Sequence, residues 1–276
     1  MPELENLLQT AIHLATAAGE RTLPYFGTTL DVETKEDESP VTIADREAET
    51  LVRHELEKLH PDHGVVGEEF GETSGPSPYR WWIDPIDGTK AFVRGVPLYG
   101  TVLGLERDGE MVVGVASFPA LGETLSAARG MGARLNGEPT FVSRQASFGR
   151  AIVSTTDGGR FRELGREAAW NRVQKAFWVR AGWGDAYGYN LVATGRIEAM
   201  IDPIINAWDV SAFPVIIEEA GGWFGSWSGE STIHGGDSLA VNLELRDALL
   251  ALLNDSSIES DAQVTVQKPD TGRLVP

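Results

Sequence analysis

The chain has 276 residues, no cysteine and a formal net charge of -18 at pH 7, and 42% of its residues are hydrophobic. This is ordinary for a globular protein made of one large domain or two closely packed halves. The absence of cysteine excludes disulfides and thiolate metal sites, and no apolar run is long enough to cross a membrane. The negative charge argues against binding to nucleic acid or anionic membranes. The first residues carry Glu3 and Glu5 and no basic segment, so we expect no signal peptide and a cytoplasmic location.

The N-terminal region predicts two long helices joined by a polar segment. Apolar residues recur at helical spacing over residues 2–25. Thr42 is a suitable N-cap for a second helix with Asp45 in its first turn, and that helix should stop at the following His-Pro pair. The charged segment 32–40 between the helices is expected to be a mobile loop or hairpin.

A β-rich region follows, up to about residue 137. An Asp-Gly pair between two of its apolar segments predicts a hairpin. The Gly/Ser/Pro-rich residues 71–78 and the glycine-rich residues 130–137 are expected to be loops and turns. The expected strands span residues 64–70, 81–83, 97–105, 111–118 and 123–128.

Strands and helices alternate from about residue 151, which favours a layered α/β arrangement. We therefore divide the chain into an N-terminal α+β half (1–148), a C-terminal α/β half (149–253) and a polar tail (254–276) that we expect to be partly disordered. The expected strands span residues 151–154, 177–179, 197–201 and 239–241, and the expected helices span residues 160–173, 185–194, 209–220 and 244–253.

The stretch W-I-D-P-I-D-G-T, residues 82–89, carries the strongest chemical signal. Asp84 and Asp87 directly follow an apolar strand and are separated by a proline-stiffened turn, so both carboxylates can face one point. Hard cations such as Mg²⁺ prefer oxygen ligands gathered in this way. Gly88-Thr89 can open a helix, whose free N–H groups attract an anion. A surface Asp-Gly turn is the alternative, but these acids directly follow a strand and do not lie in a polar linker. The stretch predicts a cation site beside a phosphate site.

Three more acids stand at predicted element ends. Glu68 in G-E-E ends a strand, Asp209 in W-D opens a helix, and Asp45 lies in the first turn of another. Each alone has an ordinary explanation as a helix cap, a dipole partner or a solvated acid. Together, G-E-E, D-P-I-D-G-T, and W-D followed by an apolar helix and Gly-Gly resemble the inositol-monophosphatase-like family of Mg²⁺-dependent phosphomonoesterases. The resemblance covers roughly residues 1–253.

The resemblance implies a fold and a metal site. The fold would be an α+β, layered αβαβα sandwich of the inositol-monophosphatase (sugar phosphatase) type, usually a homodimer, with the site between its two halves. Glu68, Asp84 and the carbonyl of Ile86 would hold one Mg²⁺, and Asp84, Asp87 and Asp209 a second. A third Mg²⁺ near Glu68 is common in the family. Two or three Mg²⁺ would also reverse the local negative charge, which otherwise repels a phosphate ester.

The resemblance also implies catalytic and phosphate-binding roles. Glu68, through the metal it holds, Asp45 and Thr89 would form the catalytic group, the last two by orienting the attacking water. The N–H groups of Gly88 and Thr89 would bind phosphate oxygens. Lys35 would close over the phosphate.

Two further acids bear on the substrate. Asp185 and Asp202 fall where the resemblance places groups that contact the alcohol, although Asp185 alone is equally a helix N-cap and Asp202 a strand-ending turn residue. Extra acids disfavour a polyanion and favour an alcohol with positive charge, such as histidinol. Segments 87–95 and 232–236 also resemble the histidinol-phosphatase branch. We therefore expect hydrolysis of L-histidinol phosphate to L-histidinol and phosphate, a step of histidine biosynthesis.

Three alternatives stay open at this point. The first is hydrolysis of inositol monophosphate, with Asp202 accepting hydrogen bonds from ring hydroxyls. The second is nucleotide 3′-phosphatase or fructose-1,6-bisphosphatase activity, for which Arg94 and Arg180 would bind a second phosphate. The third is a metal-binding regulatory protein without turnover, against which the water-orienting Thr89 argues.

Overall fold

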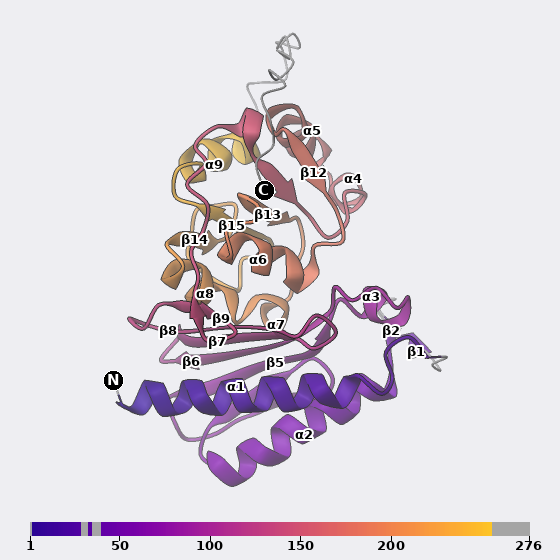
Figure 1. Ribbon diagram of the computed structural model, residues 1–276, viewed down its shortest axis with the longest axis vertical. Coiled ribbons are helices and arrows are strands. Elements are labelled where there is room, and N and C mark those ends of the chain that lie inside the picture. The colour runs from indigo at the N-terminus through magenta and orange to yellow at the C-terminus, as the bar shows by residue number, and fades with distance from the viewer. Residues whose placement is uncertain (1, 29–32, 35–39, 256–276) are drawn as a thin grey trace.

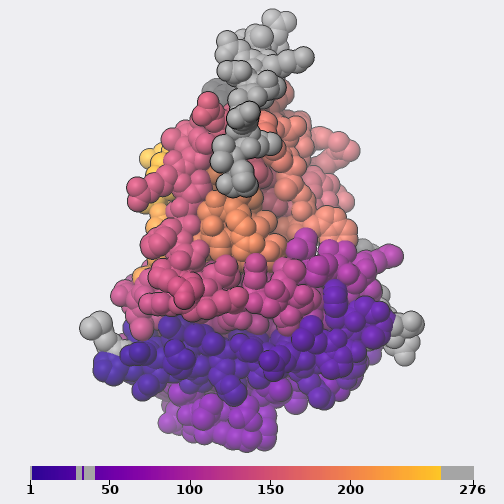
Figure 2. All heavy atoms as spheres, viewed as in Figure 1, coloured from indigo at the N-terminus to yellow at the C-terminus, as the bar shows by residue number. Residues whose placement is uncertain are grey.

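The protein is built of five layers, alternately helical and β-sheet (Figure 1). The computed structural model describes residues 2–28, 33–34 and 40–255. In the space-filling view the N-terminal residues form a broad base, and the residues of the second half stack above it (Figure 2). The predicted αβαβα arrangement is confirmed.

Two N-terminal helices cover the outer face of an eight-stranded sheet. α1 (Pro2–Thr22) buries residues at helical spacing, including Leu7, Ala11 and Leu14, which matches the predicted amphipathic pattern. α2 (Ile43–Leu59) begins at the predicted N-cap, Thr42, where a capping box satisfies free backbone donors of the first turn.

The eight-stranded sheet has the order β10-β9-β8-β7-β6-β5-β3-β4. All neighbouring strands are antiparallel except β3 and β5, which are parallel, with Gly67 beside Ile83 at their shared end. The residues that follow this last pair, Glu68 after β3 and Asp84 within β5, therefore lie at the same end of the paired strands. The strands are β3 (Gly64–Gly67), β4 (Gly71–Thr73), β5 (Tyr79–Asp87), β6 (Gly100–Arg107), β7 (Glu110–Phe118), β8 (Glu123–Ala128), β9 (Ala133–Leu135) and β10 (Glu138–Pro139).

A five-stranded mixed sheet, in the order β12-β11-β13-β15-β14, forms the second β layer. Helices α6 (Asp185–Ala193) and α8 (Phe213–Glu219) pack between the two sheets. The far face is covered by α4 (Arg160–Glu163), α5 (Glu167–Ala176) and α9 (Arg246–Asn254). The strands are β11 (Ile152–Ser154), β12 (Val179–Ala181), β13 (Ala199–Asp202), β14 (Gly222–Gly225) and β15 (Ser238–Asn242), and a 3₁₀ turn spans Phe148–Arg150.

Two helices predicted as single elements are interrupted. The helix predicted over 160–173 is divided into α4 and α5 around Gly165, which has a left-handed φ of 71°. The helix predicted over 209–220 is divided into α7 (Ala207–Val210) and α8, and Pro214, which lacks an N–H, lies in the first turn of α8. In both places one residue with special backbone chemistry outweighs the apolar periodicity.

Several short strands were not anticipated. β4 lies in the predicted loop 71–78, β9 lies in the predicted turn region 130–137, and β14 follows directly after the α8 end. Such two- to four-residue strands are fixed by their neighbours in the sheet and not by their own sequence. α1 also ends three residues before the predicted Tyr25.

Part of the predicted hairpin 32–40 is seen as β1 (Glu33–Thr34) paired with β2 (Pro40–Val41). Lys35, the predicted phosphate-closing residue, and residues 256–276 of the predicted tail lie outside the described residues.

A pair of glycines brings α7 and α8 onto the eight-stranded sheet. Gly104 of β6 and Gly114 of β7 are register partners. A Cβ at Gly104 would lie 2.6 Å from the carbonyl oxygen of Ser211, and one at Gly114 would lie 2.0 Å from that of Ala212. The α7–α8 junction thus rests on bare backbone, and this contact seats Asp209 over the sheet.

We expect Gly114→Ala to lower the free energy of unfolding by about 1–3 kcal/mol, the usual cost of overpacking, because the added methyl meets rigid backbone. Urea unfolding would measure the change. The matched control is Gly149→Ala, whose Cβ would have only Ser147 Oγ nearby, at 3.9 Å, and which should change stability by less than about 0.5 kcal/mol. Equal effects of the two substitutions would contradict the close-approach interpretation.

Candidate active site

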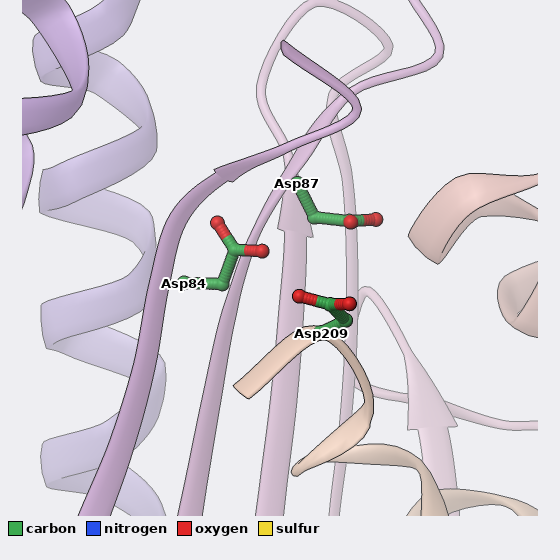
Figure 3. A group of neighbouring side chains, drawn as sticks. All are labelled: Asp84, Asp87 and Asp209. Atoms are coloured by element: carbon green, nitrogen blue, oxygen red, sulfur yellow. The ribbon is translucent and has the colours of Figure 1, made fainter. Parts of the chain in front are cut away.

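Three aspartates from distant parts of the chain converge at the edge of the eight-stranded sheet. One carboxylate oxygen from each of Asp84, Asp87 and Asp209 lies within 4.8 Å of the others, and their side chains point into a common space between β5 and α7 (Figure 3). Within residues 2–28, 33–34 and 40–255 this is the one group of three or more acids, histidines or cysteines with such spacing. The predicted convergence of these three acids is observed.

Local backbone structure sets the direction of each aspartate. The β5–β6 register shifts between Asp84 and Asp87, so the proline-containing turn is an irregularity inside a continuous strand. Asp84 Oδ1 accepts a hydrogen bond from Ile86 N at 3.0 Å, and Asp87 Oδ2 accepts one from Ala186 N at the start of α6. Asp209 is the third residue of α7, and its carboxylate accepts a capping bond from the Asn206 N–H at 2.8 Å.

Glu68 lies beside this group. Its N–H donates to the Ile83 carbonyl at 3.1 Å, which continues the β3–β5 pairing by one residue. Burial and then the charge of Glu68 raise the pKa of Asp84 well above its usual range. Burial and the charges of Asp185 and Asp209 do the same for Asp87. Burial is also the main reason why the pKa of Asp209 rises to about 7.

Asp45 and Thr89 complete the predicted catalytic group. Asp45 Oδ2 accepts hydrogen bonds from Thr42 N at 2.8 Å and Thr42 Oγ1 at 2.7 Å. Its Oδ1 is buried and has no hydrogen-bond partner in the described part of the chain. Burial raises the pKa of Asp45 to about 6, and the charge of Glu68 adds to this. Thr89 Oγ1 donates to the Ile86 carbonyl oxygen at 3.0 Å, so the hydroxyl lies beside the predicted carbonyl ligand.

The donor set fits a hard cation. The acids supply oxygen ligands only, as Mg²⁺ prefers. Burial first, and then the neighbouring negative charges, raise the pKa values of the three aspartates, so a cation that offsets these charges would favour their ionised form. The buried Asp45 Oδ1, which lacks a protein partner, fits a site that also orders water.

A cavity of about 320 Å³ opens beside the three aspartates. It includes both predicted substrate residues, together with several that were not predicted. Its lining residues are Asp87, Lys90, Thr156, Asp157, Arg160, Asp185, Tyr189, Asp202, Pro203, Ile204, Ile205 and Asp209.

Asp185 begins α6 in a left-handed conformation, with φ of 37°. Its N–H donates to Thr156 Oγ1 at 3.0 Å. Its carboxylate lies over Gly88, because Asp185 Oδ2 is 3.3 Å from where a Cβ of Gly88 would stand. Burial raises the pKa of Asp185 to about 6, although the charge of Lys90 opposes the shift. Asp185 thus borders the predicted phosphate turn.

Asp202 is more deeply placed, at the end of β13, and 4% exposed. Its Oδ1 accepts hydrogen bonds from Thr155 Oγ1 at 3.0 Å and Thr156 N at 2.8 Å, and its Oδ2 from Thr156 Oγ1 at 3.0 Å and Tyr189 O–H at 3.2 Å. Burial raises its pKa to about 7. Protein donors therefore already use both oxygens of this predicted substrate residue.

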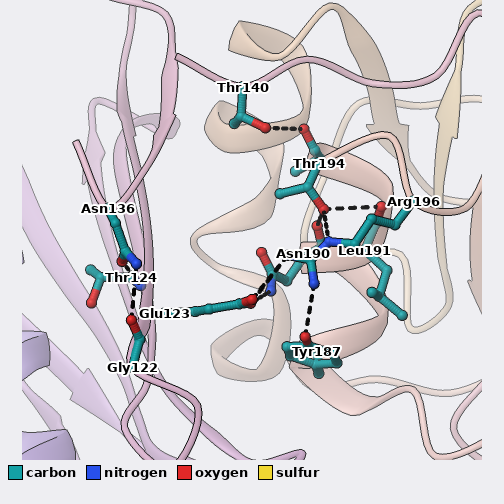
Figure 4. Close-up of polar contacts among 11 residues, drawn as sticks. Gly122, Glu123, Thr124, Asn136, Thr140, Tyr187, Asn190, Leu191, Thr194 and Arg196 are labelled. Atoms are coloured by element: carbon teal, nitrogen blue, oxygen red, sulfur yellow. Dashed lines mark hydrogen bonds and ion pairs between the residues drawn. The ribbon is translucent and has the colours of Figure 1, made fainter. Parts of the chain in front are cut away.

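Helix α6 is fixed at its other end by a polar network (Figure 4). Asn190 Nδ2 donates to Glu123 Oε2 at 2.7 Å, and Arg196 pairs with the same carboxylate at 3.2 Å. Arg196 Nη1 also donates to the Tyr187 hydroxyl at 3.0 Å. Because Glu123 begins β8, this network ties α6 to the N-terminal half and fixes the direction in which Asp185 faces the cavity.

The sequence analysis missed five polar residues of the cavity, namely Lys90, Thr156, Asp157, Arg160 and Tyr189. Lys90 follows the D-P-I-D-G-T motif directly, and Thr156 follows the end of β11, so both positions carried a usable signal. Arg160 had none, because its sequence context predicts an ordinary helical position. Arg94 and Arg180, suggested for a second phosphate, are not among the described residues that line the cavity.

The family model described as the inositol monophosphatase family matches residues 3–258. The chain belongs to this family. The resemblance predicted from the acidic motifs is thereby confirmed.

Curated relatives of this family member are phosphatases. It is 43% identical over 250 residues to the histidinol-phosphatase of Chlorobaculum parvum, and the match covers 90% of this chain and 96% of the relative. It is 38% identical to the histidinol-phosphatase of Mycobacterium tuberculosis, over 90% of this chain and 97% of that one. It is 32% identical to the inositol-1-monophosphatase of Mesorhizobium japonicum, over 88% and 94% of the two chains.

Solved structures of two inositol-monophosphatase-like proteins have the same fold. The Thermotoga maritima IMPase matches with a TM-score of 0.83 and 32% identity, covering 90% of this chain and 97% of that chain. The suhB protein of Bartonella henselae matches with a TM-score of 0.85 and 27% identity, covering 91% and 99%. Among the described residues, no helix combines the length and apolar character needed to cross a membrane.

We expect Asp87→Asn to remove the response to Mg²⁺ without loosening the fold. The amide oxygen can still accept the Ala186 N–H, while one charge of the repelling cluster is lost. Without Mg²⁺ the melting temperature should equal or exceed that of the wild type, and the rise on adding Mg²⁺ should largely disappear together with phosphatase activity. Calorimetry with and without Mg²⁺ measures this.

Asp108→Asn, in an exposed hairpin turn, is the matched control and should respond to Mg²⁺ like the wild type. Near wild-type turnover by Asp87→Asn would show that the metal assignment is wrong.

Proposed function

We propose that this phosphatase hydrolyses L-histidinol phosphate to L-histidinol and phosphate with the help of Mg²⁺. The observation that carries the proposal is the placement of Asp185, an acid outside the metal cluster that borders both the phosphate turn and the cavity. The similarity to two histidinol-phosphatases, at 43% and 38% identity, supports the same substrate.

We assign two Mg²⁺ sites to the acidic group, with a third near Glu68 as a further possibility in this family. Glu68, Asp84 and the Ile86 carbonyl form one ligand set, and Asp84, Asp87 and Asp209 form the other. When bound there, Mg²⁺ lowers the pKa of the attacking water and offsets negative charge on the phosphate.

The protein's own groups position the reactants. Asp45 Oδ1, buried and without another partner among the described residues, accepts a hydrogen bond from the attacking water. The Thr89 hydroxyl, beside the Ile86 carbonyl, holds the same water from the second side. The N–H groups of Gly88 and Thr89 donate to phosphate oxygens at the start of α3 (Thr89–Val93). Such positioning accounts for much of the rate enhancement in phosphoryl transfer.

The cavity receives the alcohol. Asp185 pairs with the ammonium or the imidazolium of histidinol. The positive charges of Lys90 and Arg160 offset the acids of the cavity, so that a phosphate group can enter. Asp202 acts on the substrate indirectly. Its carboxylate accepts a hydrogen bond from the Thr156 hydroxyl, which in turn accepts one from the Asp185 N–H. A homodimer and a role in histidine biosynthesis belong to the same proposal and rest on the family resemblance, and a cytoplasmic location belongs to it on the basis of the composition and the N-terminal residues.

A rate comparison tests the substrate. Purified protein with Mg²⁺ would be given histidinol phosphate, inositol 1-phosphate, fructose 1,6-bisphosphate and adenosine 3′,5′-bisphosphate, and phosphate release would be measured. We expect the highest kcat/KM for histidinol phosphate. A tenfold preference for inositol phosphate, about 1.4 kcal/mol, would refute the substrate assignment, and no release from any ester would favour a non-catalytic metal-binding protein.

We expect Asp185→Asn to lower kcat/KM for histidinol phosphate by about 10–100-fold, since a charged hydrogen bond contributes about 1.5–3 kcal/mol. The loss for inositol 1-phosphate should be much smaller. Asparagine is preferred to alanine here because it tolerates the left-handed backbone.

Asp157→Asn is the control, since Asp157 is an exposed acid of the same cavity. Equal losses for both esters in Asp185→Asn would mean that Asp185 is structural. Equal losses in Asp157→Asn and Asp185→Asn would mean that the general negative charge of the cavity, and not Asp185, selects the substrate.

A further inference from the structure

The loop that carries Glu68 has little burial to hold it in place. Residues 68–70 connect β3 to β4, and the pairing closes at Gly67 and Gly71. β4 is exposed along its whole length, and Phe70, at the tip of the loop, is 50% exposed. Apolar packing alone therefore does not explain a fixed position for Glu68.

A buried carboxylate of α2 binds the loop backbone instead. Glu49 has no exposed surface. Its Oε2 accepts the Glu69 N–H at 2.8 Å, and its Oε1 accepts the Phe70 N–H at 3.3 Å. Two successive backbone donors on one carboxylate fix the loop conformation directly after Glu68.

Arg53 ties the far end of the same loop to α2. Its Nε donates to Glu49 Oε1 at 2.7 Å, which gives the buried carboxylate its counter-charge. Its other nitrogens donate to the Gly71 carbonyl oxygen and, at 3.2 Å, to Thr73 Oγ1. Glu49 and Arg53 are four residues apart on one helix face, so the pair acts as a single clamp on the loop.

The absence of a side chain at Gly67 allows this clamp to close. A Cβ on Gly67 would lie 2.0 Å from Glu49 Oε1, so the carboxylate rests directly on the backbone that leads into Glu68. The same helix carries Asp45, one turn before Glu49. A single face of α2 therefore places Asp45 directly and Glu68 through the loop.

We propose that Glu49 and Arg53 are positioning residues that set the affinity of the site for Mg²⁺ by fixing Glu68. This inference rests on the Mg²⁺ site proposed above and is independent of the substrate. Groups that orient a metal ligand typically change metal affinity by about 10–100-fold when altered. Glu49 and Arg53 bind the loop after Glu68 and are not among the described residues that line the cavity, so their effect should appear in Mg²⁺ binding and not in the chemical step.

The test is the Mg²⁺ dependence of Glu49→Gln. Glutamine keeps the shape but presents an NH₂ group to an N–H donor on one side, so one bond to the loop or to Arg53 is lost. In substrate-free protein we expect the half-saturating Mg²⁺ concentration, measured by isothermal titration calorimetry, to increase about tenfold. The Mg²⁺ half-saturation of phosphate release should increase in parallel, while kcat at saturating Mg²⁺ approaches the wild-type value. Arg53→Lys, a milder change that loses the fork of donors, should shift both in the same direction.

Glu219→Gln is the matched control. Glu219 of α8 likewise accepts two loop N–H groups, from Gly130 at 2.8 Å and Gly132 at 2.7 Å, but that loop carries no metal ligand. Glu219→Gln should lower the free energy of unfolding without changing the half-saturating Mg²⁺ concentration. The proposed role of Glu49 and Arg53 would be wrong if the half-saturating Mg²⁺ concentration were unchanged in Glu49→Gln and Arg53→Lys. It would also be wrong if Glu219→Gln changed that concentration equally. Either result would leave the proposed metal site intact. A wild-type protein whose stability does not respond to Mg²⁺ would overturn the metal site and the clamp together.

Discussion

The burial of several neighbouring carboxylates is the constraint on which the rest of this structure depends. Four of the acids that converge at the sheet edge each direct one oxygen to a backbone N–H, which orients the carboxylate and leaves its second oxygen for a shared cation or water. The backbone donors belong to Thr42, Ile86, Ala186 and Asn206. Each donor comes from a cap, a strand irregularity or a helix start, where backbone N–H groups lack regular partners. The start of α2, the irregularity in β5 and the starts of α6 and α7 therefore meet at the same point in space.

Close backbone contact is the second requirement. The proposed metal ligands come from the residue after β3, from β5 and from the distant α7, and side chains at the contact points would hold these elements apart. Gly104 and Gly114 admit the α7–α8 junction to the sheet, and Gly67 admits Glu49 to the loop of Glu68. In each case a Cβ would approach another atom to within 2.6 Å or less. These glycines serve the site although none of them touches it.

The sequence predicted the site better than it predicted the connections around it. The convergence of Asp84, Asp87 and Asp209 was anticipated through the family resemblance of the motifs that carry them, since the position of each acid at the end of an element alone allowed ordinary explanations. The five-layer fold followed from the family resemblance and from the alternation of strands and helices. The breaks at Gly165 and before α8 and the short strands β4, β9 and β14 were missed, because they depend on tertiary pairing that local periodicity does not encode. The contact of Glu49 and Arg53 with the loop of Glu68 was not predicted either, because the sequence pattern indicates only ordinary charged residues of an amphipathic helix at these two positions.

The proposed substrate residue and a proposed metal ligand are joined through one peptide unit. Asp185 lines the cavity, and the next N–H, that of Ala186, donates to Asp87. The backbone there is strained, because Asp185 adopts a left-handed conformation that costs a residue other than glycine about 1–3 kcal/mol. The bond from Asp185 N to Thr156 offsets part of that cost, and Asp202 holds Thr156 by two bonds. On the proposed assignment, Asp202 therefore influences the alcohol pocket through Thr156. Within this arrangement, altering Asp202 would disturb both the alcohol pocket and the metal ligand Asp87, whereas altering the Asp185 side chain leaves the backbone bond to Asp87 in place.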